Sequence, residues 1–351
     1  MNILNCMFLK WNAGTENSFL SYSKTLKNLN YNTINLVHPK AQIINILEQN
    51  NLPYIKSKLL GKFGKNDIFT ILYFKYLIKK HNIKIVIAHQ GRLISLFKIA
   101  CSKNVKLIGI NHGYNPKHNV GVDFAITLNS TTYNNTIKLG QDKKKIIILP
   151  HSVNTETNPS QISATPVNDI IHIGSYGRFS PEKGFTNLIE SLNLLNKKNV
   201  KFKAYIGGTG IDETNLKNLV KKYNLSDHVS FTGWVTDKEK FFKKINLFIL
   251  PSKQEEFSIT ILESMKYFTP ILSTKCSGPS DIIKDQNTGF LVDIDSPEQM
   301  SNKIEFINNN SVLLPQIAAN AYSALEKKYS QTSFRNHLDK IIKEISSSND
   351  S

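Results

Sequence analysis

The sequence of 351 residues contains few cysteines: only Cys6, Cys101 and Cys276. An odd number of widely spaced cysteines excludes a disulfide framework, and this spacing is not that of metal ligands. We expect reduced core thiols, as in a cytoplasmic protein. No uncharged apolar run reaches 18 residues, so no membrane-spanning helix is expected. The apolar run that ends at Lys10 lacks the pattern of a secretory signal and predicts a buried strand.

Acidic residues are scarce in the first part of the chain. Residues 1–160 hold 21 of the 44 Lys and Arg but only 6 of the 27 Asp and Glu, a net charge of +15. The remaining residues hold 23 basic and 21 acidic residues, a net charge of +2. A general abundance of lysine does not explain this asymmetry, because the second part is also lysine-rich. Such a basic surface attracts nucleic acid, anionic lipid headgroups or a phosphorylated glycolipid.

Short apolar runs alternate with longer helical patterns along the whole chain. The length exceeds that of one compact core and predicts two domains. The runs are rich in Ile and Val and barely alternate with polar residues, which is typical of a parallel sheet covered on both faces. The strands expected in the first half are Ile3–Leu9, Thr33–Val37, Ile83–Ala88, Lys106–Asn111, Phe124–Leu128 and Ile146–Leu149.

A polar segment with two prolines, Asn154–Asn168, is the expected linker. We therefore predict a first domain over 1–160, a second over 165–330, and a C-terminal helix and tail over 331–351 that packs back towards the first. Two open α/β domains imply a ligand cleft at their strand carboxyl ends. The strands expected in the second half are Ile170–Ser175, Lys201–Ile206, Val229–Thr232, Leu247–Leu250, Pro270–Ser273 and Phe290–Val292.

Two carboxylates eight residues apart, Glu255 and Glu263, stand in the most informative stretch. A helix predicted to begin near Ser258 would place Glu255 in the preceding turn and Glu263 on the second helical turn. The free N–H groups at this helix start suit a phosphate. A bare glutamate pair at this spacing also fits a solvated helix face.

Two cations bracket the turn that follows another expected strand, in Gly174–Phe185. Arg178 binds phosphate bidentately, and Lys183 acts as a mobile point charge. Gly177 lets the backbone approach a ligand closely. Surface loops often carry such residues, so this stretch alone is a moderate signal.

In this order, the two stretches resemble glycosyltransferase family 4, a large group of retaining enzymes with the GT-B fold. The matching positions are Gly177-Arg178, Lys183-Gly184, Glu255, Glu263, Pro270 and Ser277-Gly278. Similar positions also occur in Tyr205–Ile211 and Phe231–Lys240. The resemblance implies an α/β fold of the GT-B type, with two Rossmann-like doubly wound domains facing across a cleft. The N-terminal domain would bind the acceptor and the C-terminal domain the nucleotide sugar.

Position by position, the resemblance implies that Arg178 and Lys183 hold the diphosphate and stabilise it as it leaves. Glu263 would bind the ribose, and Glu255 the donor sugar. His112 would lie close to the reacting sugar, which makes it a catalytic candidate with Glu255, Arg178 and Lys183. The further donor-binding positions are Gly14 after Ala13, Gly208, Val235, Asp237, Lys240, and the main chain of Phe257, Ser258, Ile259 and Thr260.

Three departures from the family pattern concern the donor sugar and loop geometry. Glu256 and Ser258 replace two glycines, and Glu256 adds a negative charge near the donor. The N-terminal glycine loop keeps only one glycine. The segment Pro150–Asn154 also differs from the usual pattern.

Two residues of the first half are expected to bind the acceptor. Lys117 falls where some lipid-using members carry an acceptor-binding lysine. His89 ends an expected strand, and acceptor binding and a structural role both remain open for it. For His112, the resemblance favours a functional role over a structural one.

Two weaker patterns have competing interpretations. Asp293-Ile294-Asp295 spells the metal-binding motif of a different transferase fold, but it follows the last expected strand, and no metal site is expected. Tyr54–Lys84 has eight lysines and one acid, Asp67, around an apolar run. It is either a buried helix with a basic rim or an interfacial segment at a membrane.

These observations predict a retaining, metal-independent glycosyltransferase that uses a nucleoside diphosphate sugar and no cofactor. Its expected partners are a glycan or glycolipid acceptor and an anionic membrane surface, with a place in lipopolysaccharide or other cell-envelope glycan synthesis. It is expected to be cytoplasmic and peripheral on the inner face of the plasma membrane. A sugar-nucleotide epimerase on the same scaffold is the alternative. A nucleic-acid-binding protein is less favoured, because no known binding module is visible.

Overall fold

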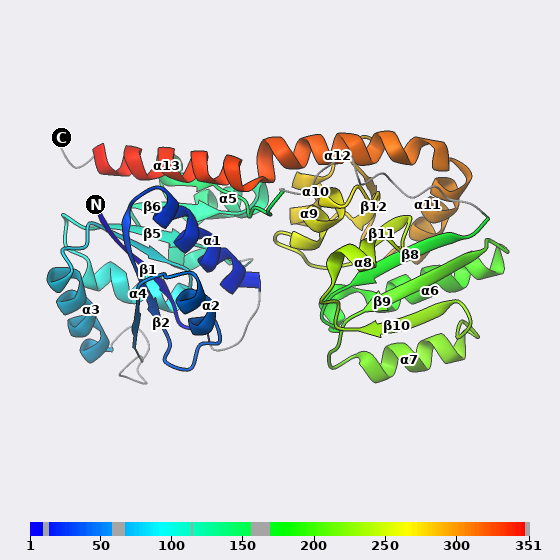
Figure 1. The fold of residues 1–351 in the computed structure, drawn as a ribbon, viewed down its shortest axis with the longest axis horizontal. Coiled ribbons are helices and arrows are strands. Elements are labelled where there is room, and N and C mark those ends of the chain that lie inside the picture. Colours follow the sequence, from blue (N-terminus) through cyan, green and yellow to red (C-terminus); the bar gives the residue numbers. More distant parts are fainter. Residues whose placement is uncertain (10–13, 58–66, 114, 156–168, 348–351) are drawn as a thin grey trace. The chain divides into compact units, whose positions relative to one another are not determined.

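A computed structural model describes residues 1–9, 14–57, 67–113, 115–155 and 169–347 (Figure 1). The chain divides into two compact units, Met1–His151 with Thr332–Ser351, and Ser152–Gln331. Each unit is a parallel sheet with helices on both faces, so the predicted pair of Rossmann-like domains is confirmed. Residues 156–168 of the predicted linker lie outside the described residues. The predicted cleft between the domains stays a prediction.

The first unit holds a seven-stranded sheet in the order β3-β2-β1-β4-β5-β6-β7, with every pair parallel. The strand order reverses beside β1, which is the topological switch point of such sheets. The sequence predicted all of these strands except β3, a three-residue edge strand. The strands are β1 (Asn2–Met7), β2 (Asn32–Val37), β3 (Tyr54–Lys56), β4 (Ile85–Ala88), β5 (Lys106–Ile110), β6 (Phe124–Thr127) and β7 (Ile146–Ile148).

Alternate residues of the central strand β1 pack into two hydrophobic cores, one on each face of the sheet. Leu4 and Cys6 pack with α3 (Ile68–Lys80) and α4 (Gly91–Ala100) on one face of the sheet. Ile3 packs on the other face with α1 (Gly14–Asn28) and α13 (Gln331–Ser347). Helix α13 therefore completes the core of the first unit although it ends the chain (Figure 1). Two more helices of this unit are α2 (Ile44–Gln49) and α5 (Ser130–Lys138).

The second unit holds a six-stranded sheet in the order β10-β9-β8-β11-β12-β13, again parallel throughout. All six strands were predicted. They are β8 (Ile171–Tyr176), β9 (Phe202–Gly207), β10 (Val229–Gly233), β11 (Leu247–Leu250), β12 (Ile271–Thr274) and β13 (Phe290–Val292). The helices are α6 (Phe185–Lys197), α7 (Glu213–Lys222), α8 (Lys238–Phe242), α9 (Ile259–Lys266), α10 (Ser277–Ile282), α11 (Pro297–Asn309) and α12 (Leu314–Tyr329).

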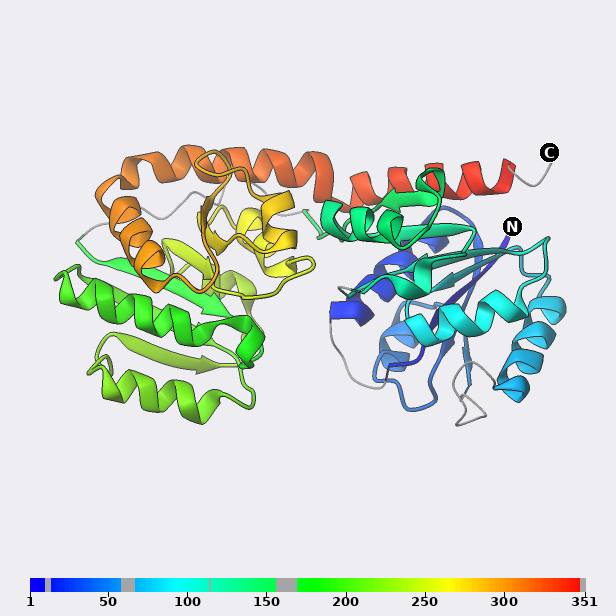
Figure 2. The ribbon, with the colours of Figure 1, turned by 180° about the vertical axis from the view of Figure 1, so that it is seen from behind.

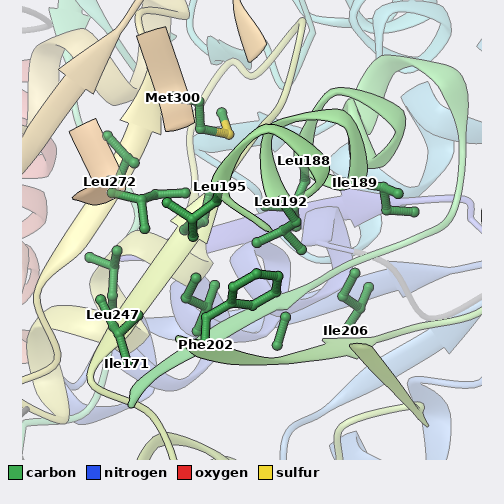
Figure 3. Packing of buried hydrophobic residues seen from close by; sticks show 14 of the residues in the cluster. Ile171, Leu188, Ile189, Leu192, Leu195, Phe202, Ile206, Leu247, Leu272 and Met300 are labelled. Atoms are coloured by element: carbon green, nitrogen blue, oxygen red, sulfur yellow. The ribbon is translucent and has the colours of Figure 1, made fainter. Parts of the chain in front are cut away.

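Both faces of this second sheet are packed. Helices α6 and α7 lie side by side on one face (Figures 1 and 2). Beneath α6, Leu192 and Leu195 contact the strands near Phe202 and Leu247 in a fully buried cluster (Figure 3). On the other face, Tyr176 packs against aromatic rings of α8 and β11. This packing fixes the carboxyl end of β8, where one of the motif stretches begins.

Candidate active site

Both motif stretches of the second unit leave the same edge of its sheet. β8 ends at Tyr176, directly before Gly177-Arg178. Its neighbour β11 ends at Leu250, and the following loop carries Glu255. Because the carboxyl ends of parallel strands meet at one edge, the two stretches converge there.

A half-buried ion pair joins the two stretches. The Lys183 ammonium lies 2.7 Å from the Glu255 carboxylate, which also accepts a hydrogen bond from the Ser252 hydroxyl at 3.3 Å. Beside it, Gly184 has a φ of +66°, and an added Cβ would lie only 2.0 Å from the carbonyl oxygen of Pro251. Only glycine allows the two loops this close approach. The Lys-Gly motif thus places a cation against the Glu255 loop.

Glu263 lies on the second turn of α9, as predicted, and accepts a short hydrogen bond from the Tyr176 hydroxyl. The Lys238 ammonium lies 3.9 Å from the same carboxylate and 3.8 Å from the centre of the Tyr176 ring. Burial, reinforced by Glu263, raises the pKa of Tyr176, and burial lowers the pKa of Lys238. Sequence reasoning missed Tyr176 and Lys238; the only available signal was the position of Tyr176 immediately before Gly177-Arg178.

Helix α9 begins where the sequence predicted, with Ser258 as its N-cap residue. The Ser258 hydroxyl makes a hydrogen bond with the Thr260 hydroxyl at 2.8 Å and does not cap the helix. The first-turn N–H groups, including those of Ile259 and Thr260, have no intrahelical acceptor and carry the positive end of the helix dipole. The preceding Phe257 and Glu256 are buried. This geometry can bind an anion.

The loop before α9 is held by Ser277 and Gly278, two of the positions that match the family pattern. The Ser277 hydroxyl and the Gly278 N–H both donate to the carbonyl oxygen of Glu255, at 3.1 and 2.9 Å. Ser277 and Gly278 belong to α10, the next element after β12 in the chain. The main chain at Glu255 is thus fixed from β12 as well as from β11.

Three of the predicted donor-binding residues lie together in one cavity of about 190 Å³. Val235, Asp237 and Lys240 line it with the aromatic rings of Tyr205 and Phe241. The Asp237 carboxylate also caps α8 by accepting from the Lys240 N–H at 2.9 Å. Apolar and aromatic walls with a few polar groups suit a flat heterocycle.

Gly208 closes the adjacent turn at the end of β9. Its N–H donates to the carbonyl oxygen of Gly233 at 2.7 Å, and its φ is +141°. An added Cβ would lie 1.9 Å from the carbonyl oxygen of Gly177. Gly208 therefore determines how closely the turns after β8 and β9 approach.

Arg178 is exposed and makes no ion pair within the described part of the chain. A hydrogen bond from Ser180 lowers the pKa of Glu182, with smaller contributions from the charges of Lys183 and Arg178. Two cations therefore act on the turn after β8. Arg178 is free to take a bidentate anionic ligand.

The residues predicted in the first unit lie in different surroundings. His89 is 2% exposed, and both of its ring nitrogens face protein groups, Asn5 and His112. Of the two roles that the sequence left open for His89, the geometry favours the structural one, because no ring nitrogen is left for an acceptor. Lys117 is exposed in a short 3-10 turn. Gly14 begins α1, and Ala13 lies outside the described residues.

Both aspartates of the Asp293-Ile294-Asp295 motif form ion pairs with lysines. The Lys275 ammonium lies 2.9 Å from Asp293, and the Lys253 ammonium lies 2.6 Å from Asp295. Asn187 also donates to Asp295, at 2.6 Å. Across the described ranges, no group of three His, Cys, Asp or Glu side chains could hold a metal ion.

The sequence of this chain is similar to those of known glycosyltransferases. Residues 157–324 match the family described as Glycosyl transferases group 1. An uncharacterized glycosyltransferase of Haemophilus influenzae is 26% identical over 78% of this chain and 79% of that protein. The lipopolysaccharide core biosynthesis glycosyltransferase LpsE of Rhizobium meliloti is 31% identical over 45% of each chain. The chain thus spans less than half of LpsE.

Two solved structures share the fold over nearly the whole length. HepE of Anabaena in complex with UDP has a TM-score of 0.85 at 17% identity, covering 98% of this chain and 100% of that one. A glycosyltransferase of Rickettsia africae has a TM-score of 0.84 at 19% identity, covering 98% of each. At this level of identity the likeness establishes the GT-B fold alone. Membership of family 4 within the group stays a prediction.

The family match spans the described strands β8 to β13, with both motif stretches at their carboxyl edge. The chain is therefore a glycosyltransferase, and its second unit matches the family described as Glycosyl transferases group 1.

Proposed function

We propose that the chain transfers a hexose-type sugar from a nucleoside diphosphate sugar to a glycan or glycolipid acceptor, with retention of configuration and without a metal ion. The observation that carries the proposal is the Lys183–Glu255 ion pair, which brings both motif stretches to one sheet edge beside the start of α9. The UDP in the HepE complex supports a nucleoside diphosphate donor. The name of LpsE supports a role in lipopolysaccharide or other cell-envelope glycan synthesis.

The charges of the second unit match what this reaction needs. Cleavage of the donor leaves a positively charged sugar and a diphosphate anion. Lys183, Arg178 and the N–H groups of the first turn of α9 are preorganised donors that stabilise the developing negative charge. With these donors on the protein, the reaction needs no metal as a Lewis acid. Retention of configuration rests on the resemblance to family 4.

The nucleoside and the sugar take separate positions in this proposal. The base occupies the cavity at Val235, Asp237 and Lys240, and Glu263 accepts from the ribose hydroxyls. Glu255, held by Lys183, is directed at the donor sugar. In the first unit, Gly14 approaches the diphosphate, His112 contacts the reacting sugar and Lys117 binds the acceptor.

The first unit also supports an anionic membrane surface as a partner. Helix α3 buries Phe74 and Leu77 in the core, but it exposes Ile68, Phe69 and Leu72 by more than half of their surface, with Tyr76 at 54%. We call Ile68, Phe69, Leu72 and Tyr76 the α3 stripe. Lys75, Lys79 and Lys80 beside it are also exposed, and the helix contains no acidic residue.

In the described part of this segment, one face of α3 is buried, and the other face combines apolar and basic side chains, which supports the interfacial alternative. A surface of this composition fits an anionic bilayer, with the lysines at the headgroups and the rings below them. A second copy of the chain fits less well, because it would bring two basic surfaces together. Within the described ranges, no helix is long and apolar enough to span a bilayer. We place the protein on the inner face of the plasma membrane as a peripheral enzyme, with no nucleic-acid partner.

A sugar-nucleotide epimerase is the rival function on this scaffold. It would change the donor sugar without an acceptor, and it has no need of a basic, apolar face on the first unit. Incubation with a panel of UDP-, GDP- and ADP-sugars, with and without glycolipid acceptors, separates the two functions. Release of nucleoside diphosphate that depends on the acceptor supports transfer. An epimerised sugar nucleotide without acceptor would overturn it.

Donor choice is measured by thermal shift with UDP, GDP and ADP. A nucleotide present at about one hundred times its Kd stabilises the folded state by about 2.7 kcal/mol. The cavity at Val235 predicts that at least one of the three raises the melting temperature. No shift with any of them would contradict nucleotide binding to the second unit.

A further inference from the structure

A buried chain of polar side chains runs through the first unit towards His112. It begins at the carbonyl oxygen of Pro53, which can only accept a hydrogen bond. The Asn35 amide nitrogen donates to it at 3.0 Å, so the Asn35 side-chain oxygen points the other way. That oxygen accepts from the Ser23 hydroxyl at 2.6 Å and from the Asn5 amide nitrogen at 3.3 Å. The main chain thus fixes the direction of the first links.

The same reasoning determines the orientation of the Asn5 amide and the protonated nitrogen of His89. The Asn5 amide nitrogen also donates to the carbonyl oxygen of Phe19 at 3.3 Å, so its side-chain oxygen must face His89. This oxygen lies 2.9 Å from Nε2 of His89 and can only accept. His89 therefore carries its proton on Nε2. Burial lowers the pKa of His89 to about 3, so the ring is neutral at neutral pH and its Nδ1 is a bare acceptor.

The bare Nδ1 of His89 determines which ring nitrogen of His112 is protonated. Its Nδ1 lies 3.1 Å from Nε2 of His112, with the ring planes 12° apart and the ring centres 5.3 Å apart. That centre separation is close to the N···N distance plus the two ring radii, so the hydrogen bond is nearly linear. Because Nδ1 of His89 only accepts, Nε2 of His112 must donate. Burial also lowers the pKa of His112, which leaves a neutral ring with no proton on Nδ1.

The hydrogen-bond chain ends at an acceptor for which the described residues supply no donor. Nδ1 of His112 is buried and has no hydrogen-bond partner among the described residues. A buried polar atom left in this state destabilises the folded protein. A hydroxyl can donate to it, whereas an ionised phosphate offers only acceptor oxygens. Of the two groups that a nucleoside diphosphate sugar offers, hydroxyl and phosphate, this nitrogen therefore selects the hydroxyl.

We propose that His89 is a positioning residue that holds His112 in the tautomer protonated at Nε2, so that Nδ1 of His112 accepts from a sugar hydroxyl. The sugar as ligand rests on the proposed function, but the tautomer rests on the hydrogen-bond chain alone. Asn5, Ser23 and Asn35 act through His89 and touch no substrate. The role of the chain is to present one defined nitrogen to the ligand.

The test is nitrogen NMR of the ligand-free full chain labelled with ¹⁵N-histidine. Long-range proton–nitrogen correlations distinguish a protonated ring nitrogen from a bare one, and the His112→Gln variant identifies the His112 signals. We expect a protonated Nε2 and a bare Nδ1 for His112 in the wild type. In His89→Leu the fixed acceptor is gone, and we expect His112 to populate both tautomers.

His151→Leu is the matched control. The His151 ring lies 5.7 Å from His112, centre to centre, and 6° from parallel, so its removal also deletes a neighbouring imidazole. The fixed His112 tautomer should survive in this variant. Protonation of His112 at Nδ1 in the wild type, or an unchanged tautomer in His89→Leu, would overturn the proposal. If His89→Leu does not fold, the wild-type spectrum still shows which ring nitrogen of His112 is protonated and so tests the proposal. Inactivity with every sugar nucleotide would refute the proposed function and leave the tautomer result intact.

Discussion

Two lysine–carboxylate ion pairs of the second unit allow the role of Lys183 to be tested against a control. Lys183 pairs with Glu255 at the strand edge, and Lys253 pairs with Asp295 at the more exposed Asp-Ile-Asp motif. Lys183→Ala should lower kcat/KM by about 10²–10³-fold, as when one preorganised donor to a developing anion is lost. Steady-state transfer assays with a melting curve for each variant measure this.

Lys253→Ala serves as the control, because an exposed ion pair contributes only about 0–1 kcal/mol. Its kcat/KM should stay close to that of the wild type. Comparable losses in the two variants would mean that Lys183 acts through loop stability rather than on the diphosphate.

The two glutamates should respond differently to loss of charge. Glu263→Gln keeps an oxygen that accepts from Tyr176 but removes the charge beside Lys238. We expect nucleoside diphosphate binding to weaken by about 10- to 100-fold, since a hydrogen bond to a charged group contributes about 1.5–3 kcal/mol. Glu255→Gln should leave that affinity nearly unchanged and lower turnover. Calorimetric titration with the nucleotide, beside turnover assays, tests this; an equal loss of affinity in both would refute the assignment.

Most of the site could be located from sequence because its residues follow strands at one sheet edge. Arg178, Lys183, Glu255 and Glu263 each stand at a fixed offset from a strand or helix end. In the structure, Lys183 pairs with Glu255, and Glu263 contacts Tyr176, two residues before Arg178. Tyr176 could not be identified, because its contact with Glu263 joins residues 87 apart in the sequence. A tyrosine at a strand end has no local pattern that indicates such a partner.

The polar chain behind His112 was missed for a similar reason. Asn5 and Asn35 lie inside apolar strands, where a single polar residue gives no periodic signal. Their pairing depends on the parallel register in which Asn5 stands opposite Asn35. Only the folded sheet shows that these amides and His89 form one buried chain.

At the scale of elements, the strands were predictable where Ile and Val cluster. β3 was missed because its three residues, Tyr54–Lys56, include no run of such residues and form only an edge of the sheet. It forms by pairing with β2 after Pro53, with Tyr54 opposite Asn35. This strand depends on tertiary context rather than on its own composition.

Helix α13 allows a prediction about how the first unit is stabilised. Leu338 and Ile342 are fully buried against strands that lie more than 200 residues earlier in the sequence. Leu338→Ala should destabilise the first unit by about 2–5 kcal/mol, because it leaves a cavity in a closed core. Hydrogen exchange should report the loss in β1, β4 and β5, and the strands of the second unit should keep their protection.

Lys340→Ala is the matched control on the same helix, since its side chain is exposed. It should change exchange rates little in either unit. An equal loss of protection in both units of Leu338→Ala would contradict this prediction, because it would show that the two units unfold together.

At the scale of the whole molecule, the charge asymmetry of the two halves makes a prediction about salt. The net charge of +15 on residues 1–160 and the lysines beside the α3 stripe should bind vesicles that contain anionic lipid. The attraction is electrostatic, so binding should weaken from low to physiological ionic strength and beyond. Co-sedimentation with anionic and neutral vesicles across a salt series measures it.

A pair of triple variants separates the α3 surface from net charge. Changing Lys75, Lys79 and Lys80 to Glu alters the net charge by the same amount as changing Lys217, Lys221 and Lys222, which are exposed on α7 of the second unit. Each lysine near an anionic surface contributes about 1 kcal/mol, so the α3 variant should bind such vesicles at least about 100-fold more weakly. The α7 variant should bind nearly as well as the wild type. Equal losses of vesicle binding in the two triple variants would show that only the net charge matters. Binding of the wild type to neutral vesicles as strong as to anionic ones would refute an anionic bilayer as the partner.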